Sequence, residues 1–103
     1  MDTNNIITLK EVAQDLQDGK DFYDQNQNGV GDYFWDSLVG DIESLTIYAG
    51  IHPKRFDLFQ MFAKRFPYAI YYDIIDSTMY VVGVLPMRRN PEWIKSQLEA
   101  REH

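Results

Sequence analysis

The sequence has no cysteine, few prolines and no long run of apolar residues. The absence of cysteine excludes disulfide bonds and thiolate metal sites, and it is typical of a cytoplasmic protein, which we expect here. Apolar runs of only a few residues exclude a transmembrane helix. The first ten residues, MDTNNIITLK, also lack the basic start and the apolar stretch of a secretory signal. We therefore expect no membrane partner.

Basic residues are scarce as well. The chain holds 10 lysines and arginines against 16 aspartates and glutamates, a net charge of −6, whereas a surface that binds nucleic acid needs an excess of positive charge. The two halves differ, because residues 1–53 hold ten acids and two bases while residues 54–103 hold six acids and eight bases. Their net charges are thus −8 and +2. This asymmetry fits either ordinary surface charge or a charged partner that contacts one face.

What the sequence does contain is typical of a folded domain. Hydrophobic residues make up 45% of the chain and aromatic residues 15%, which is a globular rather than a disordered composition. A length of 103 residues is sufficient for one modest core and too short for two. We expect a single domain, 1–103.

The first half of the chain predicts two helices. Apolar residues recur at helical spacing in the first of them: Leu9, Val12, Ala13, Leu16 and Tyr23. Asp15, Asp18 and Asp21 fall between them and are expected on the opposite, polar side. Thr8 and Glu11 have the spacing of a capping box, which predicts the helix start. Ile6 and Ile7 just before it form at most an edge strand. A second apolar stripe predicts a helix over about 32–48, with Gly50 as its stop signal: Phe34, Leu38, Ile42 and Leu45.

The link between these helices, DQNQNGVGD from Asp24 to Asp32, begins like a calcium-binding loop. Oxygen-bearing side chains stand at its first, third and fifth places, and glycine stands at the sixth. The twelfth place requires a bidentate glutamate, and here it is Trp35, which offers no oxygen. We therefore predict no metal site and no cofactor, and we interpret the stretch as the turn of a helical hairpin. In this interpretation Asn28-Gly29 and Gly31 adopt positive φ angles and Asp32 caps the second helix.

The second half of the chain predicts three strands and a last helix. The strands correspond to KRFDLFQMFAKRF, FPYAIYYDII and TMYVVGVLPM, with a tight turn at Asp76-Ser77 between the last two. In the middle strand, Tyr68, Ile70, Tyr72 and Ile74 share one face of an antiparallel sheet. Asn90 is a good N-cap, and Pro91 suits the first position of a helix. The fold class is therefore α+β.

The predicted topology brings basic residues to one edge of the sheet. Lys64 and Arg65 end the first of the three strands, and Arg88 and Arg89 end the third, so the two pairs are expected about 10 Å apart, two strand spacings. Arginine suits forked contacts with phosphate or carboxylate groups. Alternatively, Arg65 pairs with Asp41 or Glu43 and fastens the hairpin to the sheet.

Other candidates for chemistry are few. His52 is positioned to act as an acid or base, although a single histidine in a loop is more often simply solvated. Tyrosines such as Tyr68, Tyr71 and Tyr72 are able to stack on bases, although aromatic residues at strand spacing are more often core. We find no nucleophile with a matching base, no phosphate-binding glycine loop and no histidine cluster.

Five stretches together resemble the RelE/ParE superfamily of toxins from type II toxin–antitoxin systems. They are DLQDGKDFYDQ, GVGDYFWDSLVGDIESL, YAGIH, KRFPYAIYY and VVGVLPMRRNPEWI, and the resemblance extends from about Ile6 to Leu98. It implies a β-α-α-β-β-β-α fold in which a helical hairpin packs on an antiparallel sheet, with Ile6-Ile7-Thr8 as the first strand. It also implies a bacterial, cytoplasmic, growth-inhibiting protein of the plasmid-stabilisation type that a cognate antitoxin neutralises.

The resemblance leaves two kinds of target open. ParE-like relatives inhibit DNA gyrase without chemistry of their own, whereas RelE-like relatives cleave messenger RNA on the ribosome. The family's basic positions match Arg65 and Arg89, with Lys64 and Arg88 beside them, as residues that contact the target or its phosphates. Catalytic residues of a ribonuclease would be Arg65, Arg89 and His52. Pro86 stands where relatives commonly have a polar residue, which weakens the case for acid–base chemistry there. A degenerate toxin that retains only antitoxin binding is a third possibility.

Overall fold

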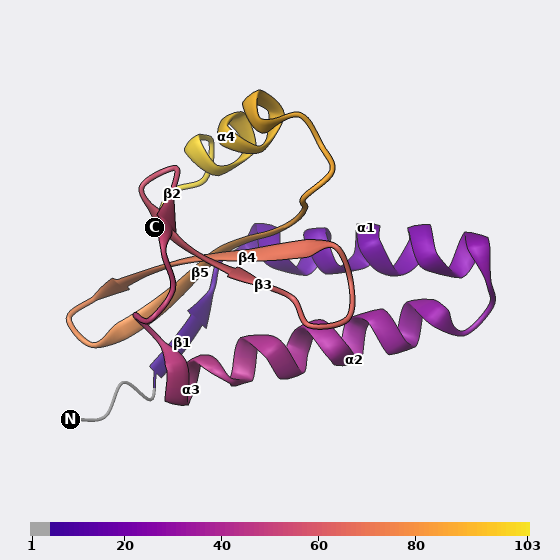
Figure 1. Cartoon of the computed structure of the whole chain (residues 1–103), viewed down its shortest axis with the longest axis horizontal. Helices are drawn as coiled ribbons and strands as arrows, with labels where there is room; N and C mark the ends of the chain where they lie inside the picture. The colour runs from indigo at the N-terminus through magenta and orange to yellow at the C-terminus, as the bar shows by residue number, and fades with distance from the viewer. Residues whose placement is uncertain (1–4) are drawn as a thin grey trace.

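The computed structural model describes residues 5–103 and shows two layers of helix around a sheet (Figure 1). Along the chain the elements are β1 (Asn5–Thr8), α1 (Lys10–Asn26), α2 (Val30–Glu43), α3 (Leu45–Tyr48), β2 (Lys54–Arg55), β3 (Leu58–Phe62), β4 (Tyr68–Ile75), β5 (Thr78–Pro86) and α4 (Pro91–Glu99). Within residues 5–103, no helix has both the length and the apolar character that crossing a membrane requires.

The five strands form one sheet in the order β1-β5-β4-β3-β2. Neighbouring strands from β2 to β5 are antiparallel, and β1 joins the edge parallel to β5. The predicted α+β fold with a helical hairpin on a small sheet is therefore confirmed, and so is the first strand at Ile6-Ile7-Thr8. The β4–β5 turn and the α1–α2 turn lie at opposite ends of the molecule (Figure 1).

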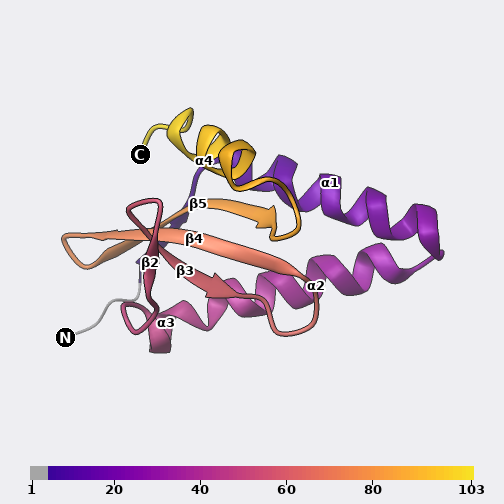
Figure 2. The same cartoon turned by 45° about the horizontal axis from the view of Figure 1, so that its top comes forward.

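The two faces of the sheet are covered by different helices. Tyr68, Ile70 and Tyr72 of β4 are buried in one core cluster with the apolar residues of α1 and α2, as their predicted common face requires. Ala69 and Tyr71 lie in a second cluster with Ile94 and Leu98 of α4. Figure 2 shows α4 lying beside the first half of α1, on the opposite side of the sheet from α2. The two clusters together bury residues 68–72 of β4, whereas Ile75 at its end is exposed.

The starts of both long helices differ from the prediction. Thr8 belongs to β1, and α1 starts after Leu9, which makes no side-chain cap. The Leu9 N–H instead donates to the Val81 carbonyl, 3.0 Å away, because β1 leads directly into the helix while still paired with β5. Helix α2 begins at Val30 after Gly29, whose φ is 92°, so Gly31 lies inside the helix and Asp32 is not the cap. The helix also ends earlier than predicted, at Glu43, and the short α3 follows it.

The α1–α2 turn is held by Asp24. Its carboxylate accepts the Gly31 N–H at 2.7 Å and the Lys20 ammonium at 3.0 Å, so a residue of α1 satisfies the first turn of α2. The ammonium of Lys20 also lies 3.2 Å from Asp32. Two hydrogen bonds lower the pKa of Asp24 below its ordinary value: the one from Lys20 has the larger effect and the one from Gly31 the next largest. The carboxylate at the first place of the calcium-like sequence thus serves the fold.

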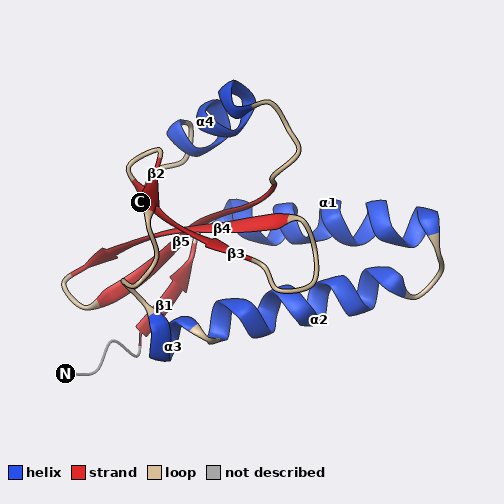
Figure 3. Cartoon of the chain, in the orientation of Figure 1, coloured by secondary structure: helices blue, strands red, loops and turns tan. Residues whose placement is uncertain are grey.

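The first of the three predicted strands is in fact two strands, β2 and β3 (Figure 3). Phe56 and Asp57 between them have φ angles of 58° and 63°, which turn the chain back on itself. Asp76 and Ser77 have similar angles, 50° and 65°, which confirms the predicted tight turn between β4 and β5. The Asn90 cap is also confirmed, since its side chain accepts the Glu92 N–H at 2.8 Å.

Asp15 is buried, contrary to its predicted place on the polar side of α1. Arg101, just beyond α4, donates to it through both ends of the guanidinium, with Nη1 2.6 Å from Oδ2 and Nη2 2.8 Å from Oδ1. The Val84 N–H adds a third hydrogen bond at 2.9 Å. Burial raises the pKa of Asp15, and the Arg101 hydrogen bonds act against that rise. This ion pair joins α1, β5 and the C-terminal segment.

Candidate functional site

The basic edge predicted from topology consists of two loops at one end of the sheet. Residues 63–67 connect β3 to β4, and residues 87–90 connect β5 to α4. The loops are adjacent because Tyr68 pairs with Pro86 across the strands and the Met87 N–H donates to the Pro67 carbonyl at 2.9 Å. All four predicted basic side chains are exposed: Lys64, Arg65, Arg88 and Arg89. Each loop therefore presents two positive charges at this end.

Arg88 and Arg89 line a cavity of about 370 Å³, which we call the arginine pocket. Apolar and aromatic residues from α1 and from the ends of β4 and β5 complete it: Phe22, Tyr23, Pro67, Tyr68 and Pro86. The Arg89 guanidinium lies over the ring of Trp93, 3.7 Å from the ring centroid. This contact limits the orientations of Arg89 and leaves its edge donors available to a partner. The pocket thus combines positive charge with aromatic walls.

Lys64 and Arg65 are outside the arginine pocket. The Lys64 main-chain N–H donates to the buried Asp41 carboxylate at 3.1 Å, which fixes the β3–β4 loop on α2. Within residues 5–103, no carboxylate forms an ion pair with Arg65. The proposed fastening of hairpin to sheet therefore exists, but it is made by Asp41 and the backbone of Lys64 rather than by Arg65.

The tyrosines near this site are un-ionised at neutral pH. Burial raises the pKa of Tyr68 to about 12 and also raises the pKa of Tyr23. Tyr68 is therefore able to donate a hydrogen bond and is a poor general base. Tyr71 and Tyr72 are core residues, 1% and 0% exposed, and so are not available to stack on a base.

His52 lies away from the arginine pocket. It is half-buried in the link before β2, and its Nδ1 is hydrogen-bonded to the Tyr72 hydroxyl. That hydroxyl also accepts the Gly50 N–H at 2.9 Å, so it links the main chain at Gly50 to the His52 ring. Tyr72 stands four residues along β4 from Tyr68, about 13 Å in a strand. Burial lowers the pKa of His52, which favours the neutral ring. The structure therefore does not bring His52 together with Arg88 and Arg89.

Sequence reasoning missed the wall that α1 contributes to the site. Phe22 is 56% exposed, although it is large and apolar, and its neighbour Tyr23 packs against Phe34 and Phe66. The sequence signal for this wall is the adjacent aromatic pair Phe22-Tyr23 near the end of the predicted helix. Only Tyr23 fits the apolar stripe, so Phe22 is expected on the surface. Trp93 was also missed, and the signal there is an aromatic residue four positions after Arg89 across a helix start.

No protein-family model matches the chain, and no curated protein has significant sequence similarity to it. Among solved structures, the chain is similar to a chain from the structure titled "Chromosomal ParDE TA system from P. aeruginosa". The TM-score is 0.74 with 12% sequence identity, and the match covers 84% of this chain and 98% of that chain. At this identity the similarity concerns the fold. The chain thus shares the fold of that chain of the ParDE system, which agrees with the fold that the sequence resemblance implies.

Proposed function

We propose that this chain is the toxin of a type II toxin–antitoxin module, that it inhibits growth by binding DNA gyrase in the manner of a ParE-like protein, and that a cognate antitoxin neutralises it. The fold similarity to a chain of a ParDE TA system supports the module. The observation that carries the mode of action is the arginine pocket. Its lining within residues 5–103 contains two arginines and aromatic or apolar residues, without a carboxylate or a histidine.

This lining favours binding over chemistry. General acid–base catalysis requires two groups whose pKa values suit proton transfer, and here the ionisable residues are arginines and tyrosines of raised pKa. Arginine and tyrosine are instead among the residues enriched at the energetic hot spots of protein–protein interfaces. Phe22 adds an exposed apolar anchor beside the two charges. A bacterial cytoplasmic target with an acidic, partly apolar surface would match this combination.

The first test is inhibition of gyrase by the purified chain. We expect loss of DNA supercoiling at micromolar protein, and growth arrest with DNA-damage signalling when the chain is induced without its antitoxin. The double change Arg88→Ala with Arg89→Ala should weaken the inhibition by about tenfold or more, as expected for hot-spot residues. Lys95→Ala removes an exposed cation of α4 outside the pocket and should leave the inhibition unchanged. Unaltered supercoiling at micromolar wild-type protein contradicts gyrase as the target.

The second candidate is a RelE-like endoribonuclease that cuts messenger RNA on the ribosome. The observation in its favour is the same positive edge, where Arg65 and Arg89 are exposed and are able to contact phosphates. It predicts codon-biased cleavage of transcripts after induction, which Arg65→Ala or Arg89→Ala abolishes while the fold persists. Growth arrest with intact transcripts rejects this candidate. Harmless expression without any antitoxin would instead indicate a degenerate toxin.

A further inference from the structure

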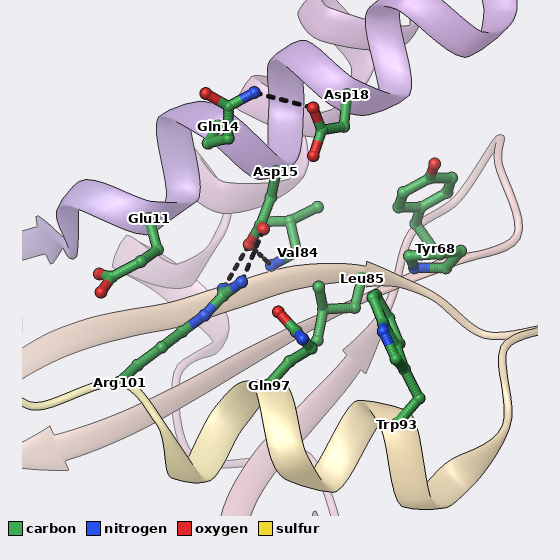
Figure 4. A pocket seen from close by; sticks show the side chains of 11 residues that line it. Glu11, Gln14, Asp15, Asp18, Tyr68, Val84, Leu85, Trp93, Gln97 and Arg101 are labelled. Carbon is green, nitrogen blue, oxygen red and sulfur yellow. Dashed lines mark hydrogen bonds and ion pairs between the residues drawn. The ribbon is translucent and has the colours of Figure 1, made fainter.

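A second cavity lies between α1 and α4, next to the arginine pocket. It has a volume of about 190 Å³, and we call it the α1–α4 slot. Helix α1 forms one wall with Glu11, Gln14, Asp15 and Asp18, and α4 with its following segment forms the other with Trp93, Gln97 and Arg101 (Figure 4). Tyr68, Val84, Leu85 and Pro86 of the sheet form the floor. Polar side chains thus face each other across a narrow space.

The charges in the slot are unbalanced. Asp15 and Arg101 satisfy each other, since two short hydrogen bonds join them at the back of the slot. The other two lining acids, Glu11 and Asp18, have no ion-pair partner within residues 5–103, and Asp18 accepts a hydrogen bond only from the neutral Gln14. Three acids and one base leave a net charge of −2 in the lining. The slot is therefore suited to one cationic group.

An aromatic residue closes one end of the slot. Trp93 rises from α4 toward Tyr68 in Figure 4, and its ring already binds one guanidinium, that of Arg89. Aromatic faces attract cations, and guanidinium groups stack on them with particular ease. The amide oxygens of Gln14 on α1 and Gln97 on α4 add neutral acceptors to the lining. A planar cation with several N–H donors fits this set better than a compact ammonium group.

The size of the slot limits its occupant. Pockets for small-molecule ligands typically have volumes of about 300–1,000 Å³, whereas this one has about 190 Å³. That volume suits a single extended side chain. The slot also adjoins the arginine pocket, because Tyr68 and Pro86 line both. A peptide segment with one side chain in the slot would therefore continue over the arginine pocket.

We propose that the α1–α4 slot is a receptor for an arginine side chain of a partner protein. The inference rests on the proposed function in one respect only, which is that the partner would be the antitoxin. The guanidinium of that arginine would stack on Trp93 near Asp18, and Glu11 would add negative charge farther along the slot. Its segment would then cover Arg88 and Arg89 and block their contacts with the target. The net charge of −8 on residues 1–53 favours such a cationic segment.

The test is an NMR titration of the ¹⁵N-labelled chain with a defined probe, Nα-acetyl-arginine N-methylamide. We expect saturable shifts of the Trp93 indole N–H and of the Gln14 and Gln97 side-chain amides, with a Kd on the order of millimolar for a single side chain. The matching citrulline compound has the same shape and no charge, and should cause no saturable shift. Trp35 of α2 lies outside the slot, so its indole signal is an internal reference.

Matched variants separate the slot from general attraction to an acidic protein. Glu11→Gln with Asp18→Asn should raise the Kd by about fivefold or more, because both unbalanced carboxylates are lost. Asp21→Asn with Glu43→Gln also removes two exposed acids, neither of which lines the slot, and should leave the Kd unchanged.

Three outcomes overturn the proposal: no saturable shift with the arginine probe, equal shifts with the citrulline compound, or equal shifts at Trp35. None of these measurements depends on toxicity. If the chain arrests growth but the titration fails, only the proposal of arginine binding in the slot is rejected. If the titration succeeds but the chain is harmless, only the proposed toxin function is rejected.

Discussion

Gly83 of β5 leaves the space through which Arg101 reaches Asp15. A Cβ atom at this position would lie 2.9 Å from the Arg101 Nη1 and 2.9 Å from the Leu98 Cδ2. Arg101 has little freedom to move aside, because its guanidinium is held at both ends by Asp15. Because Gly83 has no side chain, the Arg101 guanidinium has room to form its ion pair with Asp15 on the face of the sheet that α4 covers.

We expect Gly83→Ala to lower the free energy of unfolding by roughly 1–3 kcal/mol, the usual cost of overpacking. Gly40→Ala is the matched control, since no heavy atom lies within 4 Å of a Cβ at that position of α2. It should be neutral or stabilise by up to about 1 kcal/mol through helix propensity. Urea unfolding followed by circular dichroism measures both variants, and equal effects would contradict the steric role of Gly83.

His52 makes stability depend on pH near neutrality. Burial lowers its pKa, so the folded chain favours the neutral ring, whose Nδ1 is hydrogen-bonded to the Tyr72 hydroxyl. The unfolded chain takes up a proton near its ordinary pKa of about 6.5. The stabilisation is therefore fully present above that pH and is lost as the pH falls through the lower pKa of the folded state.

His52→Gln keeps a group able to bond to Tyr72 and removes the titration. We expect the unfolding free energy of the wild type to fall more steeply between about pH 7.5 and 5 than that of the variant. His103→Gln changes the other histidine, which pairs with Asp73 at 3.1 Å, and should keep the steeper fall due to His52. Parallel profiles for the wild type and His52→Gln would show that the ring does not titrate differently on folding.

At the scale of the elements, local sequence signals predict those parts of the fold that depend on neighbouring residues. Asn90 with Pro91 gives the start of α4, and Asp76-Ser77 gives the β4–β5 turn. The break between β2 and β3 escapes such reasoning, because Phe56, an aromatic residue typical of strands, adopts a left-handed conformation there. The buried state of Asp15 also escapes it, since its partner Arg101 is 86 positions away.

The candidate site also has one part that the sequence predicts and another that depends on packing. Strand order alone places the loops of Lys64-Arg65 and Arg88-Arg89 at one end of the sheet. Both β3 and β5 run antiparallel to β4, so the C-terminal ends of β3 and β5 lie at the same end. The aromatic wall of Phe22 and Tyr23 depends on how far α1 extends past the sheet, which packing decides and local pattern does not. The separation of His52 from Arg89 likewise follows from its contact with Tyr72 in the core.

The α1–α2 turn yields a prediction about calcium. Both Asp24 oxygens are in use, Oδ1 by the Gly31 N–H and Oδ2 by Lys20. We expect Asp24→Ala to lower the melting temperature, because the first turn of α2 loses its acceptor. Asn28→Ala changes the fifth place of the calcium-like sequence, where no side-chain hydrogen bond is made within residues 5–103, and should have a smaller effect.

Millimolar calcium should leave the melting temperature of the wild type unchanged, and a rise would contradict our interpretation of the turn.

At the scale of the whole molecule, the two faces of the sheet are attached to their helices with unequal strength. The hairpin shares one extended core cluster with β4 and β5, including Phe34 and Leu38, which are fully buried. Helix α4 contributes only Ile94 and Leu98 as buried residues, and the Asp15–Arg101 ion pair ties down the segment after it. The ion pair is therefore the main link between α4 and the first half of the chain.

Arg101→Gln should consequently loosen α4 before the rest of the fold. Removing one partner of a buried ion pair typically costs about 3–5 kcal/mol, because the other charge is left without compensation. Asp15 is only 7% exposed, so this cost applies here. We expect faster hydrogen exchange across Pro91–Glu99 than in α2, together with a lower free energy of unfolding.

The double change Asp15→Asn with Arg101→Gln should recover part of the lost unfolding free energy, since no buried charge remains. Lys95→Gln on the exposed side of α4 should change neither the exchange rate nor the unfolding free energy. Exchange that rises equally in α2 and α4 would show that the ion pair stabilises the molecule as one unit rather than fastening α4 to it.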